Sequence, residues 1–224
     1  EPRGVLEAEA GVILGDVITA FLPRGFFPYV TPGTKFVTLG GAIAADVHGK
    51  NHHKEGGFGA FVDWVELLRP DGQIVKAVQG SELFAQTLGG MGLTGVILRA
   101  ALRLRPVESG WIRQTTRSSP DLFTTMALFE ATKDATYSVA WIDGLARGRA
   151  LGRAILMLGE HAACAELKSS QMRAPFEVPN RGKKTLPLDF PNWAMGGLTV
   201  RGFNALYYAA GRRRPTETLI DWDS

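Results

Sequence analysis

The sequence predicts an α+β fold with two domains, because strands and helices come in separate groups instead of alternating regularly. A strand, a helix, a hairpin, a second helix and a long strand come first, and a second sheet-and-helix set follows. The pattern breaks near residues 107–110, so we expect domains at 1–107 and 108–224. At 224 residues, the chain is long enough to bury a sizeable core.

The first four segments predict a strand, a helix, a connection and a short helix. VLEAEAG (5–11) alternates apolar and polar residues, which is typical of a strand. LGDVITAFLP (14–23) has apolar residues at helical spacing, with a proline as its stop. Residues 24–39 are rich in glycine and proline and predict an extended, turning connection, and AIAADV (42–47) predicts a short helix.

A hairpin, a capped helix and a long strand complete the first domain. Residues 63–78 hold two apolar runs around Pro70-Asp71-Gly72, which predicts a hairpin. Ser81 is expected to cap the helix in SELFAQTLGG, which Gly89-Gly90 ends. VILRAALRLRP (96–106) alternates again and predicts one or two strands.

The second domain repeats this mixture of strands and helices. Strands are expected at 111–117, 137–143 and 153–161, with a helix that starts at Ser119-Pro120-Asp121. Residues 168–188 predict a long surface loop, 190–211 an apolar and aromatic helix, and 212–215 a basic loop.

Composition excludes several classes of protein. The net charge of +3 is too small to indicate a nucleic-acid partner. There is no apolar run of about eighteen residues, so the sequence predicts no transmembrane helix. The single cysteine, Cys164, excludes an internal disulfide and a cysteine-rich metal site.

A histidine cluster lies in GGAIAADVHGKNHHKEGG (40–57) and raises the question of a metal site. On a helix, the spacing of His48, His52 and His53 would put two of them on one face, and three nitrogen ligands can bind zinc. Gly49 disfavours that helix, and the neighbouring lysines would oppose a cation. We therefore predict no metal, with His52 and His53 as solvated loop residues.

Two glycine-rich segments favour a phosphate-bearing ligand instead. PGTKFVTLGGA (32–42) comes directly before an expected helix, and backbone N–H groups at such places can bind phosphate. It matches neither the P-loop nor the Rossmann pattern. GGMGLTGVI (89–97) alone could be a turn, but two such segments around one hairpin make a shared ligand the better interpretation.

Taken together, PGTKFVTLGGAIAADVHGKNHH and LFAQTLGGMGLTGVI resemble the second and third flavin segments of the vanillyl-alcohol-oxidase-type flavoproteins. The resemblance covers most of the chain and is most specific over residues 30–97. It implies a PCMH-type FAD-binding domain of α+β fold, followed by the start of an α+β substrate domain. It also implies that the first flavin loop precedes Glu1 and that the rest of the substrate domain follows Ser224. FAD retention by this stretch alone is therefore expected to be weak.

The resemblance assigns FAD as cofactor and names the residues that contact it. Lys50 resembles the family's substrate lysine, which can hold a phosphate or polarise a sugar hydroxyl; a solvated loop lysine is the alternative. Ala45 departs from close relatives, which have a cysteine there, but a backbone contact would survive that change. The implied FAD contacts are Gly33, Thr34, Thr38, Leu39, Gly40, Gly41, Ala45, Asp46, Val47, His48 and Ile97.

The implied activity is FAD-dependent oxidation of a secondary sugar hydroxyl. The nearest members of the family oxidise C2′ of a polyprenylphosphoryl-β-D-ribose to a ketone, and a partner nicotinamide-dependent reductase completes the epimerisation in arabinose-donor synthesis for the cell wall. Three alternatives stay open: a sugar-lactone or alditol oxidase, a non-catalytic module that binds a nucleotide or polyanion, and a metal hydrolase. We expect a cytoplasmic location or peripheral association with the inner membrane, with its periplasmic face also open.

Overall fold

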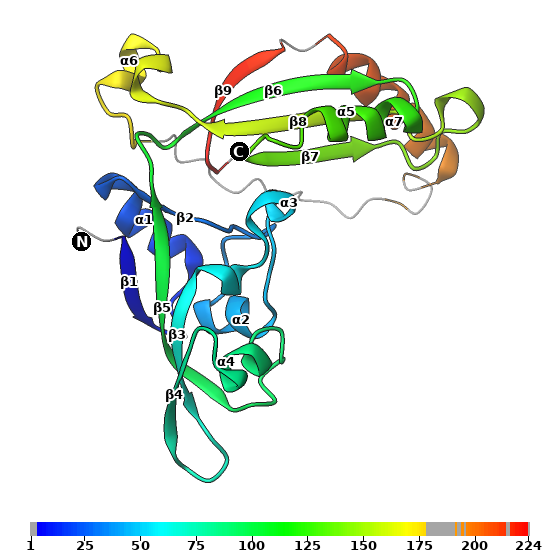
Figure 1. Cartoon of the computed structure of the whole chain (residues 1–224). Helices are drawn as coiled ribbons and strands as arrows, with labels where there is room; N and C mark the ends of the chain where they lie inside the picture. The colour runs from blue at the N-terminus through cyan, green and yellow to red at the C-terminus, as the bar shows by residue number, and fades with distance from the viewer. Residues whose placement is uncertain (1–3, 178–190, 192–193, 195, 214–215, 224) are drawn as a thin grey trace. The chain divides into compact units, whose positions relative to one another are not determined.

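The computed structural model describes residues 4–177, 191, 194, 196–213 and 216–223. Contacts divide the chain into two compact units. Unit 1 comprises Glu1–Ser109 and Ala163–Ala165, and unit 2 comprises Gly110–Ala162 and Glu166–Ser224. Each unit has its own antiparallel sheet (Figure 1). These mixed units confirm the predicted α+β class.

Unit 1 is built around a long strand, β5 (Val96–Pro106). β5 pairs antiparallel with β1 (Val5–Glu9), with β3 (Val62–Leu68) and with the short β2 (Phe26–Pro28). β4 (Ile74–Val78) joins the sheet through β3. The predicted β3–β4 hairpin is therefore confirmed.

The side chains of β5 alternate between the core and a charged face, as successive residues of a strand must. Ala100, Leu102 and Leu104 are buried. Arginines occupy the opposite parity and pair with carboxylates on neighbouring segments, as Arg103 does with Asp63 at 3.0 Å. This alternation in the sequence is what made the strand predictable.

The helices of unit 1 are short and bury their apolar sides. Leu14 and Ile18 from the first helix and Leu39 and Ile43 from the second are at most 1% exposed. Ser81 accepts a hydrogen bond from the N–H of Phe84, so the predicted cap is confirmed. The helical segments are α1 (Leu14–Phe21), η1 (Leu22–Arg24), α2 (Leu39–Ala44), α3 (His52–Glu55), η2 (Phe58–Phe61) and α4 (Glu82–Thr87).

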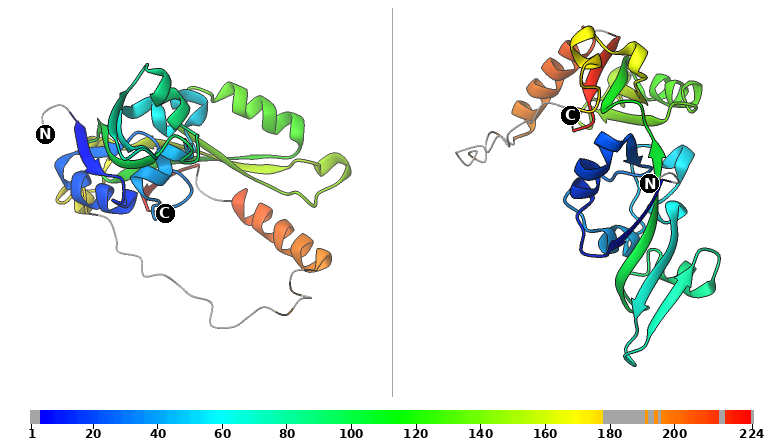
Figure 2. Two further views of the ribbon diagram at one scale, coloured as in Figure 1. Left: turned by 90° about the horizontal axis from the view of Figure 1, so that it is seen from below. Right: turned by 90° about the vertical axis from the view of Figure 1, so that its left-hand side faces the viewer.

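Unit 2 is a four-stranded antiparallel sheet with strand order β7-β8-β6-β9. Helices α5 and α7 lie on opposite faces of this sheet (Figure 2). On the α7 side, Gly211 packs against Ile155 so closely that an added Cβ would lie 2.7 Å from Ile155 Cδ1. The elements are β6 (Trp111–Ser119), α5 (Leu122–Ala131), β7 (Tyr137–Ile142), η3 (Gly148–Ala150), β8 (Ala154–His161), η4 (Cys164–Glu166), α6 (Ser169–Met172), α7 (Gly197–Gly211) and β9 (Glu217–Asp221).

A buried ionic network ties α7 to the β7–β8 connection. Asp143 is 3% exposed and accepts hydrogen bonds from Arg153 at 2.7 Å and from Asn204 of α7 at 2.7 Å. Tyr208 of α7 donates to the carbonyl oxygen of Ser119 at 2.9 Å. These polar contacts fix the helix on the sheet.

The structure corrects several sequence expectations. The 24–39 connection contains strand β2, and the expected 168–188 loop contains α6. The helix expected at 190–211 is α7 over Gly197–Gly211, and Glu217–Asp221 forms strand β9. Strands β2 and β9 and helix α6 were missed because segments of three to five residues are too short to show a hydrophobic period. Residues 178–188, most of the predicted loop, and 214–215 of the basic loop lie outside the described residues.

Candidate functional site

The predicted phosphate-binding turn before α2 is closed by internal hydrogen bonds. Thr38 caps the helix, and its hydroxyl accepts from the N–H of Gly41 at 3.1 Å. The N–H of Leu39 donates to Val12 O at 2.9 Å, and that of Gly40 donates to Ala10 O at 2.8 Å. The first three N–H groups of this helix are therefore already paired. Ligand binding at this turn stays a prediction.

Gly40 is required here by packing. A Cβ at Gly40 would lie 2.9 Å from the Cβ of Ala10, closer than real Cβ atoms approach. Leu39 is 1% exposed and belongs to the core. The side chain of Leu39, and any side chain built at Gly40, would therefore face the interior of unit 1 and not solvent.

An exposed strip of small residues runs along the outer side of the same segment. Thr38, Gly41 and Ala45, at positions i, i+3 and i+7, are all exposed. Gly33 lies earlier in the segment and is also exposed, with no atom within 4 Å of the position of an added Cβ. These positions can let a flat ligand approach the backbone closely.

The second glycine-rich segment lies against the C-terminal end of α2. The N–H of Met91 donates to Ala44 O at 2.9 Å, and that of Gly89 donates to Ile43 O at 3.4 Å. The second segment therefore contacts the end of the helix that the first segment begins.

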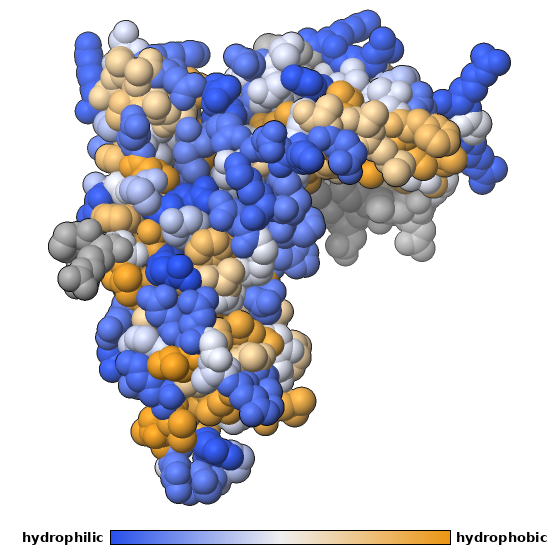
Figure 3. Space-filling view, in the orientation of Figure 1, coloured by the Kyte–Doolittle hydropathy of each residue, from blue (hydrophilic) through white to orange (hydrophobic). Residues whose placement is uncertain are grey.

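This second segment is presented at the surface of unit 1. Met91 and Leu93 are 74% and 91% exposed. Val96 lies opposite Leu68, and Leu68 lies opposite Ile74, so an apolar row crosses three strands. Hydrophobic atoms gather beside the hydrophilic tip of the β3–β4 hairpin (Figure 3). The segment can therefore be reached from solvent.

Asp46, just after α2, has a structural role in unit 1. Its φ is 41°, a left-handed conformation that is uncommon for a non-glycine residue. Its carboxylate accepts from the N–H of Gly59 at 2.8 Å. A Cβ at Gly57 would lie 2.6 Å from Asp46 Oδ1, so Gly57 leaves room for this carboxylate. Asp46 thereby ties the end of α2 to the 57–59 turn, and the half-buried Val47 adds a bond between its carbonyl and the N–H of Phe58.

His48 and Lys50 lie on a short loop whose backbone is held tightly. His48 forms a β-bridge with Gly57. A Cβ at Gly49 would lie 2.6 Å from Thr31 O, so only glycine fits there. The side chains of His48 and Lys50 are exposed on either side of Gly49.

Asn51 anchors this loop from beneath. It is fully buried, and its Nδ2 donates to Tyr29 O at 2.7 Å. Its Oδ1 is buried and has no hydrogen-bond partner among the described residues. Sequence analysis missed Asn51, because an asparagine inside a polar run gives no sign of burial.

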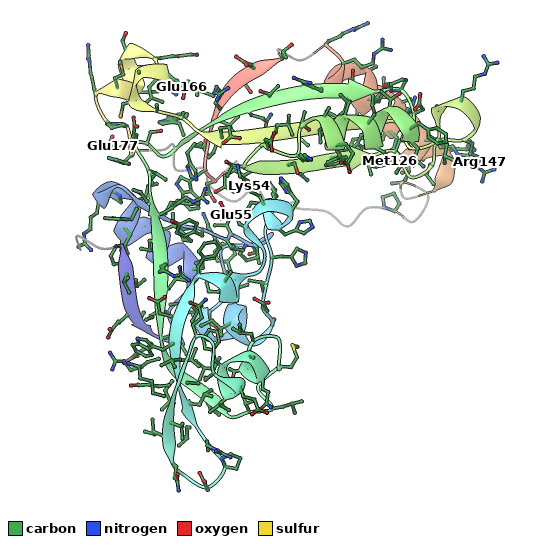
Figure 4. All side chains as sticks on the ribbon, viewed as in Figure 1. Lys54, Glu55, Met126, Arg147, Glu166 and Glu177 are labelled. Carbon is green, nitrogen blue, oxygen red and sulfur yellow. The ribbon has the colours of Figure 1, made fainter. Side chains whose placement is uncertain are left out.

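A second anchor holds the other end of α3. Glu55, labelled in Figure 4, forms an ion pair with Arg105, and both side chains are at most 20% exposed. The Arg105 guanidinium lies 4.6 Å from the centre of the Tyr29 ring, which stacks on Phe61 at 4.1 Å. Asn51 and Glu55 thus fasten the segment to one rigid stack.

The histidines do not form the helical pair that a metal site would need. α3 begins at His52, so His48 is not on that helix. The ring centroids of His48 and His52 are 5.5 Å apart, and those of His52 and His53 are 6.2 Å apart in edge contact. Within the described ranges, no three His, Cys, Asp or Glu residues are grouped to hold a metal ion.

The remaining predicted site residues lie at the edges of this region. Thr34 is exposed, and its hydroxyl accepts from the N–H of Phe36 at 3.2 Å. Ile97 is half-buried on β5 opposite Leu67. Among the described residues, neither Thr34 nor Ile97 forms a hydrogen bond with the loop of residues 48–50.

Comparison with known proteins agrees with the flavin interpretation of unit 1. Residues 1–77 match the FAD binding domain family. The chain is 37% identical over 209 residues to the decaprenylphosphoryl-beta-D-ribose oxidase of Mycolicibacterium smegmatis, covering 91% of the chain and 45% of that protein. This match and the mixed fold confirm the predicted α+β FAD-binding domain.

Two further relatives extend the comparison. An uncharacterised protein from the mprA 5′ region of Streptomyces coelicolor is 36% identical over 88% of the chain and 56% of its own length. A D-lactate dehydrogenase of Anaerostipes hadrus is 28% identical over 48% of the chain and 24% of its own length. The chain thus spans about half the length of the M. smegmatis and S. coelicolor relatives.

Proposed function

We propose that this chain works as an FAD-dependent oxidoreductase on a secondary sugar hydroxyl. Its residues 1–77 match an FAD-binding domain, so FAD is its cofactor. The proposed substrate is a polyprenylphosphoryl-β-D-ribose, oxidised at C2′ to the ketone. The observation that carries this proposal is the 37% identity to a decaprenylphosphoryl-beta-D-ribose oxidase over 91% of the chain.

The exposed strip of α2 supports a cofactor position in unit 1. Thr38, Gly41 and Ala45 offer small side chains at the surface, next to the Gly89–Met91 turn. A planar ring system and its linker could lie on this strip without meeting a bulky side chain. The buried Leu39 and the packed Gly40 would support the strip from below. The proposed FAD contacts are Gly33, Thr34, Thr38, Leu39, Gly40, Gly41, Ala45, Asp46, Val47, His48 and Ile97.

Lys50 is proposed as the residue that binds and orients the substrate. Its side chain is exposed, while the loop beneath it is fixed by Gly49 and Asn51. A cation on a rigid base can hold an anionic phosphate or stabilise charge that develops on the oxidised oxygen. FAD, when bound, supplies the acceptor for the hydride.

A reductase partner follows from the chemistry of an epimerisation. Oxidation at C2′ removes the stereocentre, and a separate nicotinamide-dependent reductase would restore it with inverted configuration. The lipid substrate also favours peripheral association with a membrane. In the part of the chain that the structure describes, no helix is long and apolar enough to cross a bilayer.

A visible absorption spectrum tests the proposed cofactor chemistry. Protein extended to its natural termini should show flavin bands, and denaturation should release FAD in near-stoichiometric amount. A colourless protein that takes up no added FAD would contradict the proposal and leave the nucleotide- or polyanion-binding alternative. Turnover of polyprenylphosphoryl ribose, compared with a sugar lactone and an alditol, then tests the substrate.

A further inference from the structure

Helix α7 is apolar on its outer face as well as on the face that packs on the sheet. Asn204, Tyr208 and Gly211, at positions i, i+4 and i+7, are buried against unit 2. On the opposite side, Leu198, Phe203 and Leu206 are 86%, 61% and 74% exposed. The outer side of a helix on a soluble protein is normally polar, so this face indicates a partner.

The exposed apolar side chains form one continuous face. Leu198, Gly202 and Leu206 follow each other at intervals of four residues, and Phe203 lies beside them. Arg213 lies just beyond the last residue of α7 and is exposed. We call Leu198, Gly202, Phe203, Leu206 and Arg213 the α7 outer face.

All charged side chains on and directly after α7 that the structure describes are cations. Arg201, Arg212 and Arg213 are exposed, and Gly197–Gly211 contains no Asp or Glu. Arg212 and Arg213 also line a cavity of about 290 Å³ together with Ala209. Apolar side chains flanked by arginines match the boundary between acyl chains and anionic headgroups.

We propose that the α7 outer face docks on an anionic lipid surface. Leu198, Phe203 and Leu206 enter the apolar boundary of the bilayer, and the arginines contact the lipid phosphates. A second copy of the chain fits this face less well. In a two-fold contact, α7 of the second copy would offer no carboxylate to pair with these arginines.

The other helix of unit 2 provides a matched control. α5 also exposes large apolar side chains: Phe123 is 84% exposed, and Met126, which Figure 4 labels, is 59% exposed. Its charge is opposite, because Leu122–Ala131 contains Glu130 and neither lysine nor arginine. Since α5 and α7 lie on opposite faces of the sheet, one flat membrane would engage only α7 (Figure 2).

Vesicle cosedimentation of the full chain tests the proposal. We expect binding to phosphatidylglycerol vesicles, about tenfold weaker binding to phosphatidylcholine vesicles, and weaker binding at high salt. The double variant Phe203→Ser/Leu206→Gln and the double variant Arg212→Gln/Arg213→Gln should each lower affinity for phosphatidylglycerol by about tenfold or more. Phe123→Ser on α5 should stay within about twofold of the wild type.

Several outcomes would overturn the proposal. The wild type could fail to bind either vesicle. The α7 and α5 variants could lose vesicle affinity equally. The wild type could also be a dimer while the α7 variants are monomers. Circular dichroism and thermal melting confirm that the variants fold, and the two double variants test the face independently. The lipid partner deepens the proposed function, but vesicle binding requires no flavin or turnover, so the two proposals fail separately.

Discussion

The side-chain amide of Asn51 donates to the carbonyl oxygen of Tyr29 at 2.7 Å, and Asn51 is completely buried. This bond joins the loop that carries Lys50 to the segment that follows β2. Because the Tyr29 ring stacks on Phe61 and lies beneath the Arg105 guanidinium, the acceptor belongs to a rigid part of unit 1. The exposed Lys50 therefore projects from a fixed backbone.

Asn51→Ala is expected to destabilise the protein. It removes the bond and leaves Tyr29 O without this donor, which costs about 1–3 kcal/mol of the free energy of unfolding. Urea denaturation measures the change. Gln73→Ala, at the exposed hairpin turn, is the control and should stay within about 0.5 kcal/mol of the wild type. Equal stability of Asn51→Ala and wild type would show that the bond contributes nothing.

Gly49→Ala should be destabilising for a steric reason. The added Cβ would lie 2.6 Å from Thr31 O, so backbone must move, at a cost of about 1–3 kcal/mol. The matched control is Gly33→Ala, whose Cβ meets no atom within 4 Å. Thermal unfolding should separate the two variants. A Gly33→Ala protein that melts as low as Gly49→Ala would contradict the close approach at Thr31.

Lys50→Ala should lower turnover without removing the cofactor. Loss of a preorganised cation beside the reacting group costs about 100-fold in rate, whereas FAD content should stay unchanged. Lys54→Ala, a change of the same charge four residues later on α3, should leave the rate within about twofold. Steady-state kinetics with a flavin-content assay give both quantities. A Lys50→Ala enzyme with wild-type kinetics would return Lys50 to the role of a solvated loop lysine.

Asp143 is expected to make the stability of unit 2 depend on pH in the acid range. Burial raises the pKa of Asp143. Hydrogen bonds from Arg153, Asn204 and the N–H of Leu145, together with the charge of Arg153, lower it by more than burial raises it. The pKa of Asp143 therefore lies below its ordinary value of 3.8. The folded state therefore binds this proton more weakly than the unfolded state. The stabilisation is present above pH of about 4 and is lost as pH falls further, through the folded pKa.

Removal of this carboxylate should change that profile. Asp143→Ala leaves Arg153 partly buried without its counter-ion, and should cost about 3 kcal/mol or more at pH 7. Measured against pH, its unfolding free energy should fall less steeply below pH 4 than that of the wild type. The exposed Glu130→Gln removes the same charge and serves as control. Parallel profiles for Asp143→Ala and wild type would contradict a lowered pKa.

Local patterns were enough to predict most of the larger elements. The alternation along β5, the Pro70-Asp71-Gly72 turn and the Ser81 cap each depend on neighbours in sequence, and the structure confirms all three. The 89–97 segment contacts the C-terminal end of α2 through the N–H groups of Gly89 and Met91, and the ligand expected to be shared with residues 32–42 stays a prediction.

The amino-acid sequence by itself determined the α+β class, the order of the longer strands and helices of unit 1 and the glycine-rich segments typical of an FAD-binding domain, because these depend on residue type and short-range period. Only the tertiary structure decided which donors and side chains are already in use. Val12 O and Ala10 O pair the first N–H groups of α2, and Tyr29 O holds the buried Asn51. These partners lie 22 to 30 residues away in sequence, so no local pattern could reveal them. Hydrogen bonding and burial depend on distance in space, which the chain acquires only when it folds.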